Sequence, residues 1–424
     1  MTARTLSSLV CCGCSCLCDD IDAVLENDRV VEVGNACAWG AARFLEWKKF
    51  SASIPRARCG SYRRLNRQRR QVLQAHEAVA ECREYLFHAQ RVVVYGLGQM
   101  SMEALEGLLL GLRRRSTVWI PSDGHLLQAA VDLYRQQCPA STTLECVRNH
   151  ADFVLFWGAN PLRSTPRLLS RYALFPRGRF TERGAEDRSA WTVDIQTTEM
   201  ATVTNLIKIP QQAEEDCVQA LHEASLGRAS TFSKELPAKE FKRLLKDLGK
   251  SRYRVFFFGR GPLFHEHGSA VLRALVSWVK DLGATAPTFL LPLPSDFNTA
   301  GFLHMFLSYG GLSNPLWHLQ GDVYGWIPQP GDVLLAVSGD CFWFLTDEQK
   351  QAVRNLHIPV LAFSAYETMT TAEADVVIAV GLQGLEASGW AVRLDGVSLF
   401  AEKLRDHGLI SDETVVEELF EPFS

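Results

Sequence analysis

The sequence predicts an α/β protein in which a small N-terminal module, rich in β-strands and cysteines, precedes parallel sheets covered by helices on both faces. Five cysteines fall within the eight residues 11–18. Short apolar strands then alternate with helical segments along the rest of the chain, an order typical of parallel sheets. The chain has 424 residues, 47% of them hydrophobic, which is enough for one large or two medium domains.

The N-terminal module is predicted from alternating apolar and polar residues. The stretches "IDAVLEND" and "RVVEV" have the period of half-buried strands and meet at the turn-forming pair Asn27 and Asp28. Helical spacing begins shortly afterwards, in "AARFLEWKKF". The module therefore presents three cysteines on one loop and a fourth after the hairpin: Cys11, Cys14, Cys18 and Cys37.

Six later segments repeat the order of buried strand, turn and helix. They begin with "RVVVYG", "TVWIP", "ADFVLFWG", "YRVFFFG", "GDVLLAV" and "IPVLAFS". Ligands collect at the carboxyl ends of such strands, where the glycine and polar turns of these units fall. The polar stretch at residues 211–242 is expected to be a helical excursion on the surface.

Composition indicates a soluble cytoplasmic protein. No apolar run reaches the roughly 18 residues that a membrane helix needs, and the first residues do not resemble a secretory signal. The cysteines beyond residue 18 are scattered singly, unlike the disulfide framework of a small secreted protein. The net charge of −4 gives no overall attraction to nucleic acid.

Seven arginines between Arg56 and Arg70 form a local exception to this acidic balance. The interleaved aromatic residues of a single-strand nucleic-acid site are nearly absent from this run. An acidic neighbouring subunit is therefore the expected contact, and neither nucleic acid nor a membrane is expected as a partner.

The cysteine spacing indicates a metal site. Cys11-x2-Cys14-x3-Cys18 lets one loop offer three thiolates to an inorganic centre, and Cys37 supplies the fourth. A zinc ion would also accept four thiolates, but its usual pattern has two CxxC pairs and this chain has one. Cys12 and Cys16 fall between the candidate ligands, and a chance cluster of cysteines in a tight loop stays open as an alternative.

Two further motifs are weak. "GLGQMS" at residues 96–101 has the first two glycines of a dinucleotide fingerprint without the third, and fits either a phosphate-sized turn or a tight strand–helix junction. "HEHG" could bring His265 and His267 near a metal, but ordinary polar residues at a helix start are the preferred interpretation.

Together the segments resemble the B subunit of formylmethanofuran dehydrogenase, a member of the molybdopterin oxidoreductase superfamily. The resemblance begins in "CCGCSCLCDDI" and "NACAWGAARF" and continues through "ADFVLFWGANPLRSTPRLLSRY", "FFFGRGPLFHEHGSAVLRALV" and "LPLPSDFNTAG". It ends in "TTAEADVVIAVGLQGLEASGWAVRLDGVSL" and so covers nearly the whole chain.

The resemblance implies a [4Fe–4S] cluster on the four cysteines and a molybdopterin cleft between two doubly wound α/β domains. By analogy residues 1–55 form the cysteine module, residues 56–125 with 251–424 form one discontinuous domain, and residues 126–250 form an inserted domain. Pterin phosphates and guanine would meet residues at strand ends: Asn160, Arg163, Pro166, Arg167 and Asp194. An arginine beside phosphate and an acid that accepts from guanine amino groups make physical sense.

One departure from the family pattern changes the expected function. Family dehydrogenases carry a cysteine or selenocysteine that ligates molybdenum or tungsten just after the second α/β strand. Here Ser122, Asp123 and His125 follow that strand, "STVWIP", and the next cysteine is Cys138. Serine or aspartate ligates molybdenum in other enzymes of the superfamily, so coordination stays open, but the metal–pterin site is expected to be degenerate.

A related assembly fits this departure. Methylotrophic bacteria have a formyltransferase/hydrolase complex that keeps a dehydrogenase-like B subunit and moves one-carbon units from formyl-tetrahydromethanopterin to formate without a redox step. The sequence therefore favours a structural B subunit with other subunits of that complex as partners. The alternatives are an active molybdenum or tungsten formylmethanofuran dehydrogenase subunit and another pterin-dependent oxidoreductase.

Overall fold

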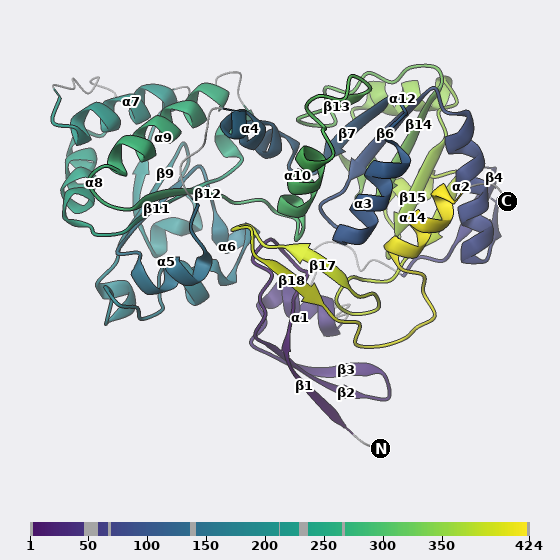
Figure 1. Cartoon of the computed structure of the whole chain (residues 1–424), viewed down its shortest axis with the longest axis horizontal. Coiled ribbons are helices and arrows are strands. Elements are labelled where there is room, and N and C mark those ends of the chain that lie inside the picture. The colour runs from purple at the N-terminus through teal and green to yellow at the C-terminus, as the bar shows by residue number, and fades with distance from the viewer. Residues whose placement is uncertain are drawn as a thin grey trace. The chain divides into compact units, whose positions relative to one another are not determined.

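The computed structural model describes residues 3–45, 58–66, 69–135, 141–211, 213–228, 236–264 and 268–421 (Figure 1). Two compact units divide the chain. Unit 1 combines the residues up to Gly124 with Asp296–Arg393 and the C-terminal segment from Ser398, and unit 2 comprises His125–Ser295 with Leu394–Val397. No helix of the described ranges is long and apolar enough to cross a membrane.

The inserted unit is longer than the sequence predicts. The expected boundary is residue 251, but the insertion extends to Ser295. The reason is strand pairing: the two strands that follow residue 251 join the sheet of unit 2. The cysteine module, expected as a separate domain, groups with unit 1.

The cysteine module contains an antiparallel sheet of β1 (Arg4–Leu9), β2 (Ile21–Glu26) and β3 (Arg29–Gly34), followed by α1 (Ala38–Leu45). The predicted hairpin is present, and Asn27 and Asp28 at its turn both have positive φ angles, of 50° and 58°. These two residue types tolerate that conformation better than most. Strand β1, which is polar and largely exposed, is not predicted by the sequence pattern.

An eight-stranded sheet forms the centre of unit 1. Its strands, in spatial order, are β13 (Trp317–Leu319), β7 (Thr117–Pro121), β6 (Arg91–Gly96), β14 (Asp332–Val337), β15 (Val360–Ser364), β16 (Val376–Ala379), β4 (Tyr62–Asn66) and β5 (Arg69–Val72). The first six are parallel, β4 pairs antiparallel with β16 and β5 pairs antiparallel with β4, so the predicted parallel sheet is confirmed. The strands β6 and β14 are almost completely buried, as expected for strands covered on both faces.

Helices and a second hairpin surround this sheet. The helices are α2 (Ala75–His88), α3 (Met102–Gly111), α10 (Thr299–Ser308), α11 (Cys341–Phe344), α12 (Asp347–Asn355), α13 (Met369–Glu373) and α14 (Asp412–Phe420). Helices α2, α3 and α14 lie together over one face of the sheet (Figure 1). The hairpin of β17 (Gly389–Val392) and β18 (Ser398–Ala401) packs Ala391 and Ala401 against Cys12.

The junction after β6 explains the "GLGQMS" motif. Gly96 has a φ of +107°, and a Cβ atom there would lie 2.1 Å from the carbonyl oxygen of Val337. Glycine is therefore required because two strand ends approach closely. Ser101 then accepts a hydrogen bond from the Ala104 N–H and caps α3. This is a tight strand–helix junction.

The arginine-rich segment forms the β4–β5 hairpin at the edge of the unit 1 sheet. Arg63 pairs with Glu81 at 2.6 Å, and Arg64 pairs with Asp375 at 3.2 Å. These two arginines are thus paired within the chain, and the contact with an acidic neighbouring subunit stays a prediction. Arg56 and Arg67 lie outside the described residues.

Unit 2 contains a five-stranded parallel sheet. Its strands, in spatial order, are β10 (Asn205–Lys208), β9 (Ser189–Asp194), β8 (Phe153–Trp157), β11 (Arg254–Phe258) and β12 (Thr288–Pro292). Its helices are α4 (Gly124–Arg135), α5 (Leu144–His150), α6 (Pro161–Ser164), α7 (Glu214–Ser225), α8 (Ala238–Lys250) and α9 (Gly268–Leu282), with short turns η1 (Leu169–Ala173), η2 (Gly184–Glu186), η3 (Glu199–Thr202) and η4 (Gly261–Phe264). Helices α7, α8 and α9 cover one face and α5 the other (Figure 1).

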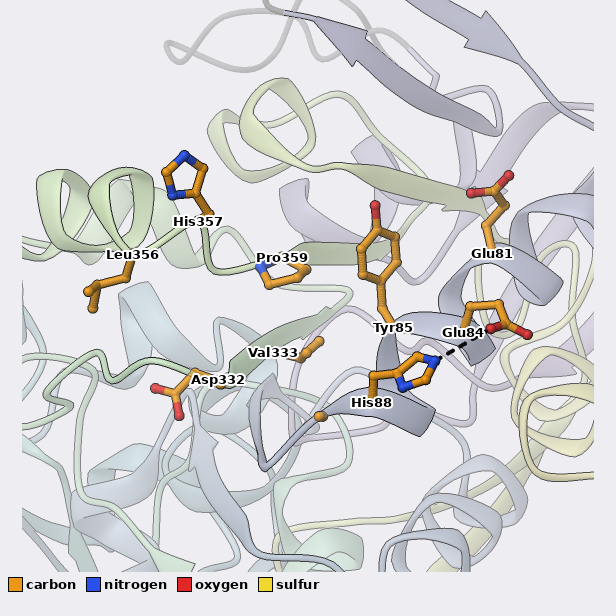
Figure 2. A pocket seen from close by; sticks show the side chains of 11 residues that line it. Glu81, Glu84, Tyr85, His88, Asp332, Val333, Leu356, His357 and Pro359 are labelled. Carbon is orange, nitrogen blue, oxygen red and sulfur yellow. Dashed lines mark ion pairs between the residues drawn. The ribbon is translucent and has the colours of Figure 1, made fainter.

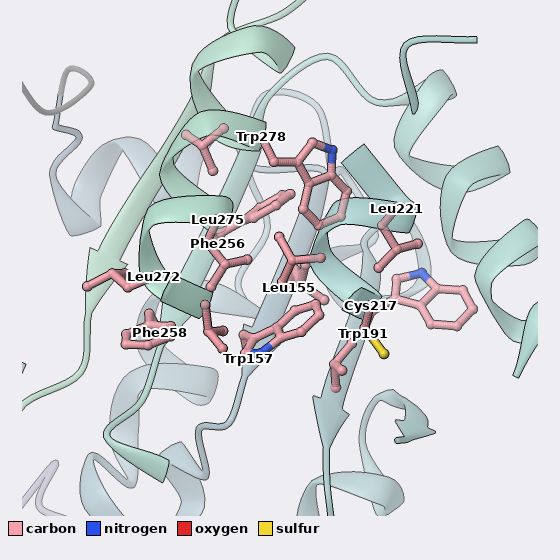
Figure 3. Packing of buried hydrophobic residues seen from close by; sticks show 14 of the residues in the cluster. Leu155, Trp157, Trp191, Cys217, Leu221, Phe256, Phe258, Leu272, Leu275 and Trp278 are labelled. Carbon is pink, nitrogen blue, oxygen red and sulfur yellow. The ribbon is translucent and has the colours of Figure 1, made fainter. Parts of the chain in front are cut away.

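The core of unit 2 corrects the prediction of a surface excursion at residues 211–242. Trp157, Trp191 and Trp278 pack with the strand residues Leu155 and Phe256 (Figure 3). Helices α7 and α8 contribute buried apolar residues to the same core: Cys217, Val218, Leu221, Phe241 and Leu244. Because these residues recur at helical spacing, the polar stretch supplies two covering helices of the sheet.

Candidate functional site

A pocket of about 590 Å³ lies at the carboxyl ends of β8, β9 and β11 in unit 2. The chain runs from β8 to β9 and β10 on one side and then crosses to β11 and β12 on the other. The strand order thus reverses between β8 and β11, and open α/β sheets bind ligands outside the strand ends at such a reversal. The pocket is therefore in the position expected for a ligand site.

Three of the five residues assigned to cofactor binding line this pocket. Asn160 and Arg163 follow β8, and Asp194 ends β9. Pro166 and Arg167 are not among the described residues that line it. The pocket also contains two acids that the sequence does not single out, Glu199 and Glu214.

Glu199 engages the positive charge of the pocket. Its carboxylate accepts hydrogen bonds from Arg163 Nε at 2.9 Å and from Asn160 Nδ2 at 2.7 Å. The Arg163 guanidinium, with help from the backbone and Asn160, lowers the pKa of Glu199 to about 2. Glu199 is therefore ionised at all physiological pH values, and its charge compensates that of Arg163.

Asp194 is held at the floor of the pocket. Burial raises the pKa of its carboxyl, and the N–H groups of Gln196 and Ile195 act in the opposite direction. The Gln196 N–H donates to Asp194 at 3.0 Å. Two nearby polar atoms, Asn160 Oδ1 and Thr198 Oγ1, are buried without a hydrogen-bond partner, which is unusual and typical of sites that a ligand completes.

The charges of this pocket do not suit a polyanionic pterin dinucleotide. Of the described residues that line it, Arg163 is the one cation, whereas three are acids: Asp194, Glu199 and Glu214. Phosphate groups need free cationic or N–H donors. The pocket thus offers polar atoms to a ligand but little positive charge.

The cysteine loop forms a second candidate site, in unit 1. The Cys11 N–H donates to the Cys18 carbonyl at 2.8 Å and closes the loop. A Cβ atom at Gly40 of α1 would lie 3.2 Å from Cys11 Sγ and 3.9 Å from Cys37 Sγ, so both sulfurs border the same small space. Cys37, the expected fourth ligand, thus lies near the loop, directly before α1.

The thiols of the loop are buried and influence one another. Burial raises the pKa of Cys11, and the nearby Cys14 and Cys18 raise it further, while Arg43 lowers it. The described cysteines are all free thiols. No three histidine, cysteine or acidic side chains of the described residues stand in the arrangement of a metal site. Cysteine is the donor type that an iron–sulfur centre uses, but it binds as the thiolate, so such a centre would have to displace the proton that burial keeps on Cys11.

The three residues at the expected metal-ligand position are divided between the two units, and Asp123 has a structural role in unit 1. Asp123 is 2% exposed, and its Oδ2 accepts hydrogen bonds from the Asp296 N–H at 3.3 Å and the Thr299 hydroxyl at 3.2 Å. The Ser122 N–H donates to the Gly96 carbonyl at 3.3 Å. His125 begins unit 2, whereas Ser122 and Asp123 belong to unit 1. Asp123 therefore fixes the loop that leads into α10. Cys138, His265 and His267 lie outside the described residues.

A further pocket, of about 450 Å³, lies beside α2 in unit 1 (Figure 2). Glu84 and His88 of α2 line it, and His88 Nε2 lies 3.9 Å from Glu84 (Figure 2). Asp332 and Pro359, at the starts of β14 and β15, form another wall. This is the amino end of the parallel strands, opposite to the end where ligands bind in such sheets. Asp332 is already paired with Arg91 at 2.7 Å, so this pocket is a weaker candidate.

Two known proteins are similar to this chain along its whole length, although no family model matches it. The B subunit of tungsten-containing formylmethanofuran dehydrogenase 2 of Methanococcus maripaludis is 27% identical over 443 residues, which cover 98% of this chain and 98% of that protein. The protein of the same name from Methanocaldococcus jannaschii is 25% identical over 438 residues, which cover 98% of this chain and 97% of that protein.

A solved structure is also similar. It is the formyltransferase/hydrolase complex (FhcABCD) from Methylorubrum extorquens in complex with methylofuran, with a TM-score of 0.61 and 18% identity. The match covers 82% of this chain and 96% of the matched chain. At this identity the similarity shows that the two chains share a fold.

Proposed function

Because this chain is a homologue of the formylmethanofuran dehydrogenase B subunit along nearly its whole length, we propose that it is the corresponding subunit of a formyltransferase/hydrolase complex. Such a complex converts formyl-tetrahydromethanopterin and water to tetrahydromethanopterin and formate. This hydrolysis needs no electron transfer, so it makes no demand on a molybdenum or tungsten site in this chain. The chain then serves as a structural partner of the hydrolase and transferase subunits.

The observation that carries this proposal is the environment of Asp123. The position that should hold a metal thiolate holds Ser122 and Asp123, and the Asp123 carboxylate is buried and bonded to the start of α10. Releasing this carboxylate to a metal would take an acceptor from the Asp296 N–H and the shorter of two acceptors from the Thr299 hydroxyl. Unpaired buried donors cost about 1–3 kcal/mol each. The residue therefore supports the fold of unit 1 rather than a redox centre.

The charge of the unit 2 pocket supports the same conclusion. Three acids surround a single arginine that is already paired, which opposes a cofactor with several phosphates. Two independent observations thus support a degenerate metal–pterin site: the bonded carboxylate of Asp123 in unit 1 and the acidic pocket in unit 2.

We further propose that the four cysteines can still hold a [4Fe–4S] cluster. Cys11, Cys14 and Cys18 would bind from the loop and Cys37 from the start of α1. Such a cluster supplies one-electron transfer when bound. Arg43 lies near the cysteine loop, where a guanidinium would compensate part of the negative charge of four thiolates.

The second candidate function is an active molybdenum or tungsten dehydrogenase subunit. The names of the two curated relatives favour it, since both proteins are described as tungsten-containing. In that case Ser122 or Asp123 would have to ligate the metal. Another pterin-dependent oxidoreductase would need the same metal ligand.

Metal analysis of the co-purified complex separates the two functions. If the chain is a structural subunit, the complex should release formate from formyl-tetrahydromethanopterin while it contains less than about one-tenth of an equivalent of molybdenum or tungsten per chain. Stoichiometric molybdenum or tungsten, together with formyl oxidation coupled to an electron acceptor, would overturn the proposal and establish the dehydrogenase.

A further inference from the structure

The unit 2 pocket has the position and the donors of an anion site. It lies where the strand order reverses between β8 and β11, the place where open α/β sheets bind nucleotides. Arg163 and Asn160 both project donors into it from the segment after β8. A guanidinium and a side-chain amide are common partners of phosphate oxygens.

Both donors are occupied by one carboxylate of the chain itself. Glu199 Oε1 accepts from Arg163 Nε at 2.9 Å, and Glu199 Oε2 accepts from Asn160 Nδ2 at 2.7 Å. Glu199 Oε1 also accepts from Arg163 Nη2, so one carboxylate satisfies three N–H groups. A phosphate group would present its oxygens to the same two side chains, since guanidinium groups bind phosphate as they bind carboxylate.

The backbone holds Glu199 in this position. Glu199 opens the short helix η3, and the Thr202 hydroxyl donates to its carbonyl oxygen at 2.8 Å. The next residue, Met200, is completely buried and anchors the turn. An exposed ion pair on a loose loop contributes little because ordering it costs entropy, but here the fold has already fixed the backbone beneath the carboxylate.

We propose that Glu199 is a specificity residue that occupies the phosphate position of the unit 2 pocket and so excludes nucleoside phosphates and related phosphoesters. Asp194 and Glu214, which line the same pocket, add to the repulsion. The inference rests on the proposed function in one respect: if the chain binds no pterin cofactor, blocking this pocket to phosphates costs it no activity.

The test measures binding of GMP and of guanosine to the full-length chain, co-purified with its partner subunits, by isothermal titration calorimetry. Glu199→Ala should raise the affinity for GMP by about tenfold or more, because it removes a charge within a few ångströms of the phosphate. The affinity for guanosine, which has no phosphate, should not change. Adding Arg163→Ala to Glu199→Ala should abolish the gain.

Glu223→Ala is the matched control. Glu223 is also in unit 2 and pairs with Arg228 at 3.1 Å, and its side chain is 42% exposed against 47% for Glu199. It does not line the pocket. Both variants remove one negative charge, so GMP binding that improves equally in both would reflect net charge and would refute the inference.

The remaining outcomes separate this inference from the proposed function. If neither the wild type nor Glu199→Ala binds GMP, the inference is wrong and the proposed function stands. If the wild type binds GMP as tightly as Glu199→Ala, the inference is also wrong. Metal analysis of that wild-type complex then tests the proposed function separately: stoichiometric molybdenum or tungsten would show that the metal–pterin site is not degenerate.

Discussion

At the scale of single residues, the structural role of Asp123 gives a stability prediction. Asp123→Ala should lower the free energy of unfolding by about 1–3 kcal/mol, because the Asp296 N–H and the Thr299 hydroxyl lose a buried acceptor. Thermal denaturation of the purified chain or complex measures the change. The control is Asp347→Ala, whose side chain is 92% exposed and which should change stability by less than about 0.5 kcal/mol. Equal effects of the two substitutions would contradict the role given to Asp123.

Ser122 gives the complementary prediction on activity. It stands at the expected metal-ligand position, directly after β7. Ser122→Ala should leave the rate of formate release by the assembled complex within about twofold of wild type, because the proposed function places the hydrolysis on a partner subunit. A loss of about a hundredfold, near 2.7 kcal/mol in the barrier, with the complex still assembled, would show that this region performs catalysis.

Some of the residues that line the unit 2 pocket can be predicted from the sequence. Asn160, Arg163 and Asp194 are predictable because they end strands or follow them directly, where ligands bind in parallel sheets. Glu199 is not, because it lies five residues beyond the strand end, in a turn whose path the sequence pattern does not define. Its partners are evident only from the geometry. An acid shortly after a strand-ending aspartate is the one available signal.

At the scale of elements, the buried strands are predictable and the exposed ones are not. Strands β6, β8 and β11 are continuous apolar runs because helices cover both of their faces. Strand β1 and the β4–β5 hairpin are polar, because they lie at sheet edges and face water, so no periodic pattern distinguishes them from loops.

The cysteine loop is the element with the most direct test. If the loop and Cys37 hold an iron–sulfur cluster, the anaerobically purified complex should be brown and should contain about four iron atoms per chain. Cys14→Ser should remove most of the visible absorption. Cys12→Ala serves as the control, since Cys12 is equally buried in the same loop but is not a proposed ligand. Colourless wild-type protein without iron or zinc would show that the cysteines no longer bind a metal.

A buried ion cluster in the loop between β16 and β17 predicts that the stability of the fold depends on pH. Glu386 is fully buried and pairs with Arg405 at 2.8 Å and with Arg58. Burial alone would raise the pKa of Glu386, but the Leu382 N–H and the two arginines outweigh it, so the pKa is lowered below its ordinary value of 4.5. The ion pairs of Glu386 therefore stabilise the fold fully when the pH is above the ordinary pKa of 4.5. This stabilisation is lost as the pH falls through the lowered pKa of the folded protein.

The variant Glu386→Gln should test this sign. At about pH 7 it should lower the free energy of unfolding by roughly 3 kcal/mol, because the arginines lose a buried countercharge. The difference from wild type should shrink as the pH falls below 4.5 and through the lowered pKa of Glu386, because the wild-type carboxylate then becomes protonated. Urea denaturation at a series of pH values measures it. Glu186→Gln, an exposed partner of Arg183, should show neither effect. A difference that stays constant with pH would contradict the assignment.

At the scale of the whole molecule, the insertion of unit 2 is predictable in kind but not in extent. Six strand–turn–helix units predict parallel sheets, but a sequence does not say which sheet a given strand enters. The strand β11 is a short apolar run like β14, yet it pairs with β8 rather than with β6. Boundaries between interleaved units depend on such long-range pairing, which local residue patterns do not encode.

The chain as a whole is expected to depend on its partner subunits. In the aromatic segment "CFWFL", Cys341 and Phe342 are buried in unit 1. Trp343 and Phe344 of the same short helix α11 are 67% and 44% exposed. Large aromatic residues exposed in this way are common anchors of protein interfaces. This arrangement suits a subunit whose surface another chain covers.

Expression alone should therefore give a poorly soluble or self-associated chain, and co-expression with the hydrolase-like subunit should restore a soluble complex, as measured by size-exclusion chromatography. Replacing Trp343 and Phe344 together by serine should weaken the complex by at least about tenfold, because interface anchors of this kind contribute about 2 kcal/mol or more. Asp347→Ser, which changes a neighbouring exposed residue without removing apolar surface, should leave the complex intact. A monomer that is soluble by itself and binds no other member of the complex would show that the chain acts alone.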